Sequence, residues 1–266
     1  MKTITRLVTS ALLLGAQTAT ANNAIPGNAF TNNNGLAAAS AAAPMWYLPS
    51  GTCMPSAAED GQGHQTNGVD TDNCNINKLS HNCPPQPPWQ GTNTFYGNVG
   101  GEPFSTIPTY WSVKKCANTW KIIYYVYFKK DTGHKSDWEG IVVSFRDAGS
   151  DNWLRDTVKM EQDGHHKQIN WGDINDTFDD TDDWQAFRQR NRDHGKFYFG
   201  KFHHSVHQDW HTTSFKDTCP PSSGDDFRNG DYQFWARNNL RHVSVLNPAW
   251  NWGKASSPAN IDLCTY

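Results

Sequence analysis

The sequence predicts an all-β fold, a two-sheet antiparallel β-sandwich with one or two peripheral helices. Trp, Tyr and Gly are plentiful (12, 9 and 21 residues) while Leu is sparse, as in β-rich chains with many turns. Residues 120–128 (WKIIYYVYF) and 138–145 (WEGIVVSF) are dense in β-branched and aromatic residues, which is typical of buried strands. The chain has 266 residues, 36% of them apolar, enough for one substantial core.

The remaining elements follow from weaker patterns. Residues 129–136 separate the two strongest strand segments and predict a hairpin loop between them. Residues 196–206 (KFYFGKFHHSV) and 241–246 (RHVSVL) predict two further strands. The apolar residues of 184–193 (WQAFRQRNRD) have helical spacing, so we expect a peripheral helix there.

The N-terminus has the pattern of a secretion signal. Lys2 and Arg6 precede a short apolar run, and the small-x-small sequence Ala19-Thr20-Ala21 predicts cleavage after residue 21. The Asn- and Ala-rich residues 22–45 carry no periodic pattern, so we expect a flexible lead-in to one domain at 46–266. No later segment is long and apolar enough for a transmembrane helix. We therefore expect a secreted, extracellular protein.

The charge excludes some partners. Cleavage after residue 21 removes two basic residues and no acidic one, which moves the formal net charge from -3 to -5. No basic run is present to neutralise phosphates, so we expect neither a nucleic-acid partner nor simple electrostatic adhesion to anionic lipid. We expect a monomer.

Cysteine usage indicates an oxidising compartment. An even, widely spaced set without a CxxC pair predicts disulfides rather than a structural zinc site, and comprises Cys53, Cys74, Cys83, Cys116, Cys219 and Cys264. Fifteen pairings are possible; we expect one within the first three cysteines and one between Cys219 and Cys264. Asn175-Asp176-Thr177 is an N-glycosylation sequon, which predicts a surface loop at Asn175.

Four polar residues gather where the second strong strand begins, within the stretch DTGHKSDWEGIVV: Asp131, His134, Asp137 and Glu139. The period-two geometry of a strand turns Asp137 and Glu139 to one face. An unpaired Glu139 inside an apolar strand would cost several kcal/mol by rough estimate, and clustered carboxylates repel one another. A divalent cation resolves both problems; Mg²⁺ or Ca²⁺ is favoured, with zinc and manganese as competing ions.

A plainer interpretation of the same stretch is a solvated hairpin turn. Asp131-Thr132-Gly133 has turn chemistry, and Lys129, Lys130 and Lys135 could pair with the acids on the surface. Both interpretations remain open from the residues alone.

Residues 124–145 (YYVYFKKDTGHKSDWEGIVVSF) resemble the central region of the necrosis- and ethylene-inducing-like proteins, secreted cytolysins of plant-associated microbes. The family's heptapeptide Gly-His-Arg-His-Asp-Trp-Glu corresponds here to Gly133–Glu139, where Lys135 replaces arginine and Ser136 replaces the second histidine. Weaker likenesses occur in order along the chain, at 51–55, 164–167, 202–205 and 252–255. The six cysteines exceed the family's usual number, which suggests a divergent branch.

The resemblance implies a function. Such proteins fold as β-sandwiches, bind a divalent cation and lyse plant plasma membranes by engaging glycosphingolipid head groups; they are not known as enzymes. Carried over by position, the cation ligands would be Asp131, His134, Asp137 and Glu139.

Three further residues are candidates for function, and two other classes of function fit the same residues. His165 and His204 are the best candidates for a second group lining the ion pocket, and Trp210, among polar neighbours, for an exposed aromatic that meets lipid or sugar. One alternative is a secreted metal-dependent hydrolase in which the ion activates water and Glu139 or His134 is the base. Another is a non-toxic lectin-like protein.

Overall fold

The computed structural model describes residues 22–85, 107–162, 164–180, 186–210, 228, 230 and 232–266. Strands dominate this part of the chain and form two sheets, accompanied by two short α-helices and several 3₁₀ turns. The predicted fold class is therefore confirmed. The predicted signal segment, residues 1–21, and Cys219 lie outside the described residues.

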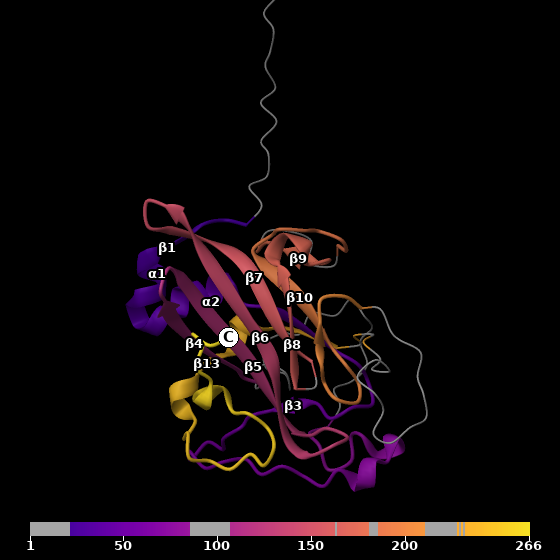
Figure 1. Cartoon of the computed structure of the whole chain (residues 1–266). Coiled ribbons are helices and arrows are strands. Elements are labelled where there is room, and N and C mark those ends of the chain that lie inside the picture. The colour runs from indigo at the N-terminus through magenta and orange to yellow at the C-terminus, as the bar shows by residue number, and fades with distance from the viewer. Residues whose placement is uncertain are drawn as a thin grey trace, which may run out of the picture.

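The larger sheet has eight strands and forms the front of the molecule in Figure 1. Its main path runs β1-β7-β6-β5-β4-β13, with β3 added to β5 and β8 to β7. All pairs are antiparallel except β13 with β4. The strands are β1 (Ile25–Pro26), β3 (Pro55–Ser56), β4 (Thr109–Cys116), β5 (Thr119–Lys130), β6 (Lys135–Gly149), β7 (Asn152–Gln162), β8 (His165–Asn170) and β13 (Leu240–His242).

The smaller sheet has five strands in the order β11-β10-β2-β12, with β9 paired to β10. β10 and β2 are parallel, and the other pairs are antiparallel. These strands are β2 (Met45–Leu48), β9 (Thr177–Phe178), β10 (His194–Phe199), β11 (Val206–His207) and β12 (Tyr232–Trp235).

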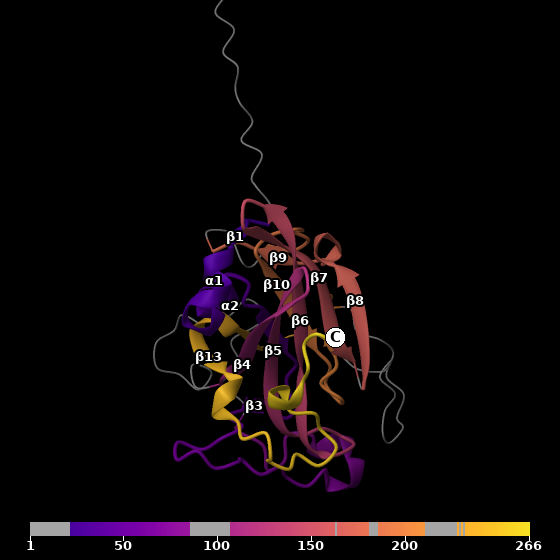
Figure 2. The same ribbon diagram turned by 60° about the vertical axis from the view of Figure 1, so that its left-hand side comes forward.

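The helical elements are short and lie at the periphery of the sheets (Figure 2). They comprise α1 (Gly27–Thr31), η1 (Asn32–Gly35), α2 (Leu36–Ala41), η2 (Asp72–Cys74), η3 (Ile76–Lys78), η5 (Trp171–Asp173), η7 (Ala236–Asn239), η8 (Val243–Val245) and η9 (Pro258–Asn260). None of the helices in the described ranges has the length and apolar character needed to cross a lipid bilayer.

Apolar side chains bury the β5–β6 hairpin on both faces. Between the sheets, the ring of Phe128 on β5 lies 5.4 Å from that of Phe199 on β10. On the outer face, Tyr127 and Trp138 pack against Trp252 of the C-terminal segment. The prediction of a strand buried on both sides is thus confirmed for 122–128, while Trp120 and Lys121 are half-buried.

Residues 22–45 are packed against the larger sheet, so the predicted flexible lead-in is wrong. The Phe30 side chain is 1% exposed and contacts the rings of Trp120, Phe145 and Trp153. The fully buried Ala39 accepts a hydrogen bond from Tyr124 at 2.7 Å. The small alanine side chains allow α2 to approach the sheet closely. The Ala-rich composition of this segment therefore reflects tight packing against the sheet.

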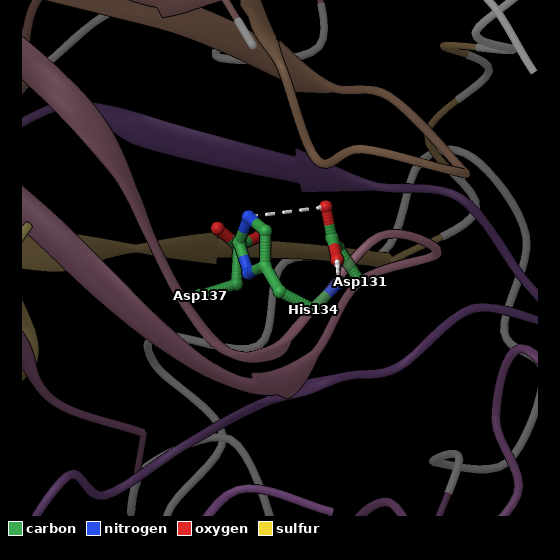
Figure 3. Close-up of side chains that lie close together, drawn as sticks. All are labelled: Asp131, His134 and Asp137. Carbon is green, nitrogen blue, oxygen red and sulfur yellow. Dashed lines mark hydrogen bonds and ion pairs between the residues drawn. The ribbon is translucent and has the colours of Figure 1, made fainter. Parts of the chain in front are cut away.

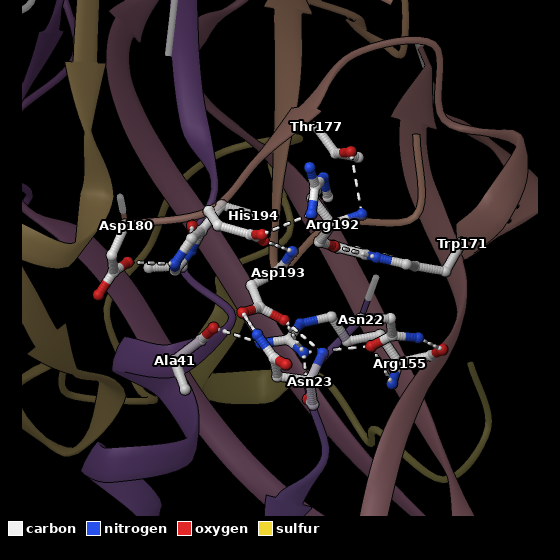
Figure 4. A network of polar contacts seen from close by, with 12 residues as sticks. Asn22, Asn23, Ala41, Arg155, Trp171, Thr177, Asp180, Arg192, Asp193 and His194 are labelled. Carbon is white, nitrogen blue, oxygen red and sulfur yellow. Dashed lines mark hydrogen bonds and ion pairs between the residues drawn. The ribbon is translucent and has the colours of Figure 1, made fainter. Parts of the chain in front are cut away.

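A polar network ties this segment to both sheets (Figure 4). The buried Arg155 side chain of β7 bonds Asn22 and Asn23, and pairs with Asp193 at 3.0 Å. Asp193 in turn accepts hydrogen bonds from the backbone and side-chain amides of Asn23, each at 2.7 Å. The network joins the N-terminal segment, β7 and the start of β10.

Three expected elements differ in the structure. Residues 186–193 form bends and turns rather than the expected helix, since they supply polar contacts to β9 such as Gln189 O to Thr177 N at 2.8 Å; residues 184–185 lie outside the described part. The expected strand at 196–206 is a β10–β11 hairpin, because the chain reverses where Gly200 N bonds Ser205 O at 2.9 Å. The strand at 241–246 stops at His242, where η8 begins.

Two disulfides join pairs of cysteines that both lie within the described ranges. Cys53 is bonded to Cys83, which confirms a pair within the N-terminal cluster. Cys116 is bonded to Cys264, so the expected bond between Cys219 and Cys264 is wrong. The C-terminal tail crosses the larger sheet and reaches the β4–β5 turn, a proximity that sequence spacing does not reveal.

Phe30→Ala tests whether the N-terminal segment belongs to the core. Removing this buried ring should lower the free energy of unfolding by about 3–5 kcal/mol, measured by urea denaturation. Leu36→Ala, at a side chain 37% exposed, is the matched control and should cost far less. Equal, small effects of the two substitutions would mean that the segment does not contribute to the core.

Candidate divalent cation site

The β5–β6 hairpin closes with a tight polar turn. Lys130 and Lys135 form its last pair, leaving residues 131–134 as the turn. Oδ1 of Asp131 accepts hydrogen bonds from the backbone N–H groups of Gly133 (2.7 Å) and His134 (2.6 Å). This is the local Asx bonding by which Asp favours turns. It fixes the carboxylate, whose Oδ2 lies 3.6 Å from His134 Nε2.

Asp131, His134 and Asp137 lie close together around a common point (Figure 3). One ligand atom from each lies within 4.8 Å of the others. This is the only group of three or more His, Cys, Asp or Glu side chains within the described ranges that could hold a metal ion.

The histidine is oriented for ligation. His134 Nδ1 lies 2.9 Å from the carbonyl oxygen of Ser136, to which an Nδ1–H donates. With the proton on Nδ1, the Nε2 lone pair faces the carboxylates. Metal-binding histidines characteristically donate their second ring nitrogen to a carbonyl or carboxylate in this way.

Strand register places the two acids of β6 as parity predicts. Asp137 pairs with Phe128 and Glu139 with Val126, both residues of the core between the sheets. Trp138 faces the outer cluster. Glycine is required at position 140, directly after Glu139, for a steric reason. A Cβ there would lie 2.1 Å from the carbonyl oxygen of Tyr124.

The electrostatics of the cluster favour a bound cation. Burial, and then the negative charge of Asp131, raise the pKa of Asp137 well above its ordinary value. Burial also raises the pKa of Asp131, but His203, His134 and the turn N–H groups outweigh that effect, so its pKa lies below the ordinary value. A divalent ion would neutralise both carboxylates and remove their repulsion.

The cluster lies in the wall of a hollow of about 200 Å³. Glu139 lines this hollow too, although it is not part of the three-residue cluster. The C-terminal segment and the β7–β8 hairpin supply much of the remaining wall, including Glu161, His166, Lys254, Ser256 and Tyr266. The hollow is large enough for an ion with water molecules or a small polar group.

The solvated-turn interpretation is wrong. Asp131 and Asp137 are 7% and 4% exposed. Two of the lysines that the turn interpretation would pair with these acids serve others: buried Lys130 bonds Asp72 at 2.8 Å, and Lys135 Nζ lies 4.0 Å from Asp70.

Of the other predicted residues, only His204 reaches the cluster. Its Nδ1 lies 2.9 Å from Oδ2 of Asp137, and its ring stacks on Phe128 with centroids 3.9 Å apart. His165 is exposed on β8 and does not line the hollow. Trp210 is 47% exposed, as expected, but also lies outside the hollow.

Sequence reasoning missed His203 and His166. His203 Nδ1 lies 3.7 Å from Oδ2 of Asp131, and His166 Nε2 lies 2.8 Å from Glu161 in the same hollow. Both histidines were expected within one strand at 196–206, but they lie in the β10–β11 turn, where His204 has a φ of +57°. The signal that could have indicated this turn is Gly200.

The side chain of Ser136 takes no part in the cluster, although its carbonyl oxygen orients His134. Its backbone has a φ of +60°, and its hydroxyl lies 3.0 Å from that of Tyr127. A Cβ added to Gly68 would lie 2.5 Å from the Ser136 hydroxyl, so the loop passes in close contact. No space is left at this position for a larger side chain without rearrangement.

Comparison with known proteins gave structural matches alone. No family profile and no curated protein sequence matches the chain. It is similar to a crystal structure of the "non-toxic HaNLP3 protein" (TM-score 0.48, 16% identity, 85% of this chain and 86% of that one). It is also similar to "NLPPya in complex with mannosamine" (0.47, 15%, 84% and 83%). A third match is Necrosis and Ethylene inducing Protein 2 from the causal agent of cocoa's Witches Broom disease (0.45, 16%, 90% and 86%).

Isothermal titration of the metal-free protein with Mg²⁺, Ca²⁺ or Mn²⁺ should detect one cation per chain. Asp137→Asn should weaken binding at least about tenfold, because it removes a ligand charge. Asp147→Asn, at an exposed acid of the same strand, should have no effect.

Affinity for the ion should also rise with pH through the range in which Asp137 loses its proton. The raised pKa of Asp137 means that its proton competes with the ion at low pH. A pH-independent affinity, or full binding by Asp137→Asn, would contradict the assignment.

Proposed function

We propose that this chain is a divergent necrosis- and ethylene-inducing-like protein that acts as a secreted, cation-dependent cytolysin or effector. Its target would be the glycosphingolipid head groups of the plant plasma membrane, and its ion Mg²⁺ or Ca²⁺. Asp131, His134 and Asp137 would hold the ion, with Glu139 beside it. The protein would act as a monomer and by binding rather than by turnover.

One observation carries this proposal. His134 and Asp137, which match the histidine and the aspartate of the family heptapeptide, lie together in the cluster with Asp131, two residues before it. The overall structural matches, at 14–16% identity, do not carry it. The polar lining of the hollow beside the cluster suits a hydroxylated ligand that meets both the ion and fixed side chains.

Other parts of the proposal depend on the sequence. Secretion follows from the signal pattern of residues 1–21, and the two disulfides agree with an oxidising compartment. Glycosylation at Asn175 stays a prediction; that residue lies in a half-buried bend beside β9. Trp210 remains a candidate for contact with the membrane because of its exposure.

Dye release from plant plasma-membrane vesicles tests the function. The wild-type protein should cause leakage that a chelator abolishes and added Mg²⁺ or Ca²⁺ restores, because the ion organises the head-group site. Asp137→Asn should reduce leakage at least about tenfold, whereas Asp147→Asn should match the wild type.

Vesicles made without glycosphingolipid serve as the lipid control and should not leak. Cation binding together with turnover of a soluble substrate would favour a metal-dependent hydrolase instead. If the protein binds the ion but causes no leakage and turns over no substrate, a non-toxic binding protein is favoured. Leakage that is indifferent to chelator would contradict the proposed mechanism.

A further inference from the structure

A buried threonine lies directly behind the histidine that contacts the cation cluster. Thr52 is 1% exposed, and its hydroxyl donates a hydrogen bond to the carbonyl oxygen of Lys201 at 2.6 Å. The same oxygen lies 3.1 Å from Nε2 of His204. A hydroxyl has one proton, and Lys201 receives it. The Thr52 oxygen therefore accepts a hydrogen bond from Nε2–H of His204.

This contact completes the positioning of the His204 ring. The ring plane is set by stacking on Phe128, at an interplanar angle of 9°. Rotation within that plane is restrained at both nitrogens, by Asp137 at Nδ1 and by Thr52 at Nε2. Nε2–H donates to Thr52, and when the ring carries its second proton Nδ1–H donates to the ionised Asp137 carboxylate 2.9 Å away.

Thr52 itself is fixed by its neighbours in the chain. It precedes Cys53, which is 1% exposed and bonded to Cys83. Thr52 does not line the hollow, so its hydroxyl meets neither an ion nor a ligand there. Its hydroxyl can act on the cation through His204, which contacts Asp137.

We propose that Thr52 is a positioning residue of the cation site: its hydroxyl orients His204, and His204 holds the Asp137 carboxylate in the geometry that binds the ion. This inference rests on the cation site proposed above. Outer partners of metal ligands commonly change affinity by roughly 10–100-fold when they are removed. The disulfide-bonded loop at Cys53 is thereby connected to ion binding although it contributes no ligand.

Thr52→Val removes the hydroxyl with little change in shape and should weaken Mn²⁺ or Ca²⁺ binding roughly tenfold, measured by calorimetric titration. Thr52→Ser keeps the hydroxyl and should retain affinity within about threefold of wild type, since a smaller loss follows from the missing methyl group. Thr109→Val is the matched control, because that fully buried hydroxyl bonds Trp46 instead. Its affinity should equal that of the wild type.

A second measurement follows the Nε2 proton of His204 in the absence of any cation. In ¹⁵N nuclear magnetic resonance of the metal-free protein, His204 should show a proton on Nε2 that exchanges slowly with water in the wild type and in Thr52→Ser. In Thr52→Val this proton should exchange rapidly. Such a change is not expected from a general loss of stability, which Thr109→Val would share.

Equal cation affinities of the wild type and Thr52→Val would overturn the inference and leave the cation site intact. A wild-type His204 without a proton on Nε2 would overturn it as well. If the wild type binds none of the cations, the proposed function fails, and with it the role of Thr52 in ion binding. The exchange of the Nε2 proton would then still report whether Thr52 holds the ring.

Discussion

Repulsion between two buried carboxylates, Asp131 and Asp137, is the constraint on which the functional end of the molecule depends. Both lie at the closed end of the β5–β6 hairpin, largely removed from water. Burial weakens solvent screening, so the negative charge of one strongly affects the other. The adjacent histidines relieve part of this repulsion, and a divalent cation would relieve the rest. The repulsion that destabilises the metal-free site would therefore favour the binding of a divalent cation.

The remainder of the fold holds the closed end of the β5–β6 hairpin in place despite this repulsion. Core side chains from the second sheet and the outer cluster under the C-terminal segment cover both faces of the hairpin. The Cys116–Cys264 disulfide fastens the C-terminal segment, which supplies Lys254 and Tyr266 to the wall of the hollow. Thr52, next to the Cys53–Cys83 disulfide, supports the cluster from the opposite side through His204.

Local patterns in the sequence predicted much of this arrangement. The apolar runs indicated β5 and β6, and parity correctly placed Asp137 and Glu139 on one face because strand geometry needs no tertiary information. The Ala-rich residues before Met45 were misjudged, since burial of small side chains against Phe30 and the sheet has no periodic signature. The helix expected at 184–193 failed for a related reason: Gln189 and Arg192 bond β9 and Asp179 instead of forming a helix. The roles of His203 and Thr52 depend on long-range contacts that sequence spacing cannot reveal.

The location of the ion tests the central claim most directly. Crystals grown with Mn²⁺ and measured at a wavelength where manganese scatters anomalously should show one strong peak beside the β5–β6 turn. We expect that peak at about 2.0–2.3 Å from carboxylate oxygens of Asp131 and Asp137 and from Nε2 of His134. A peak elsewhere, or none in crystals whose cluster is accessible to solvent, would contradict the account.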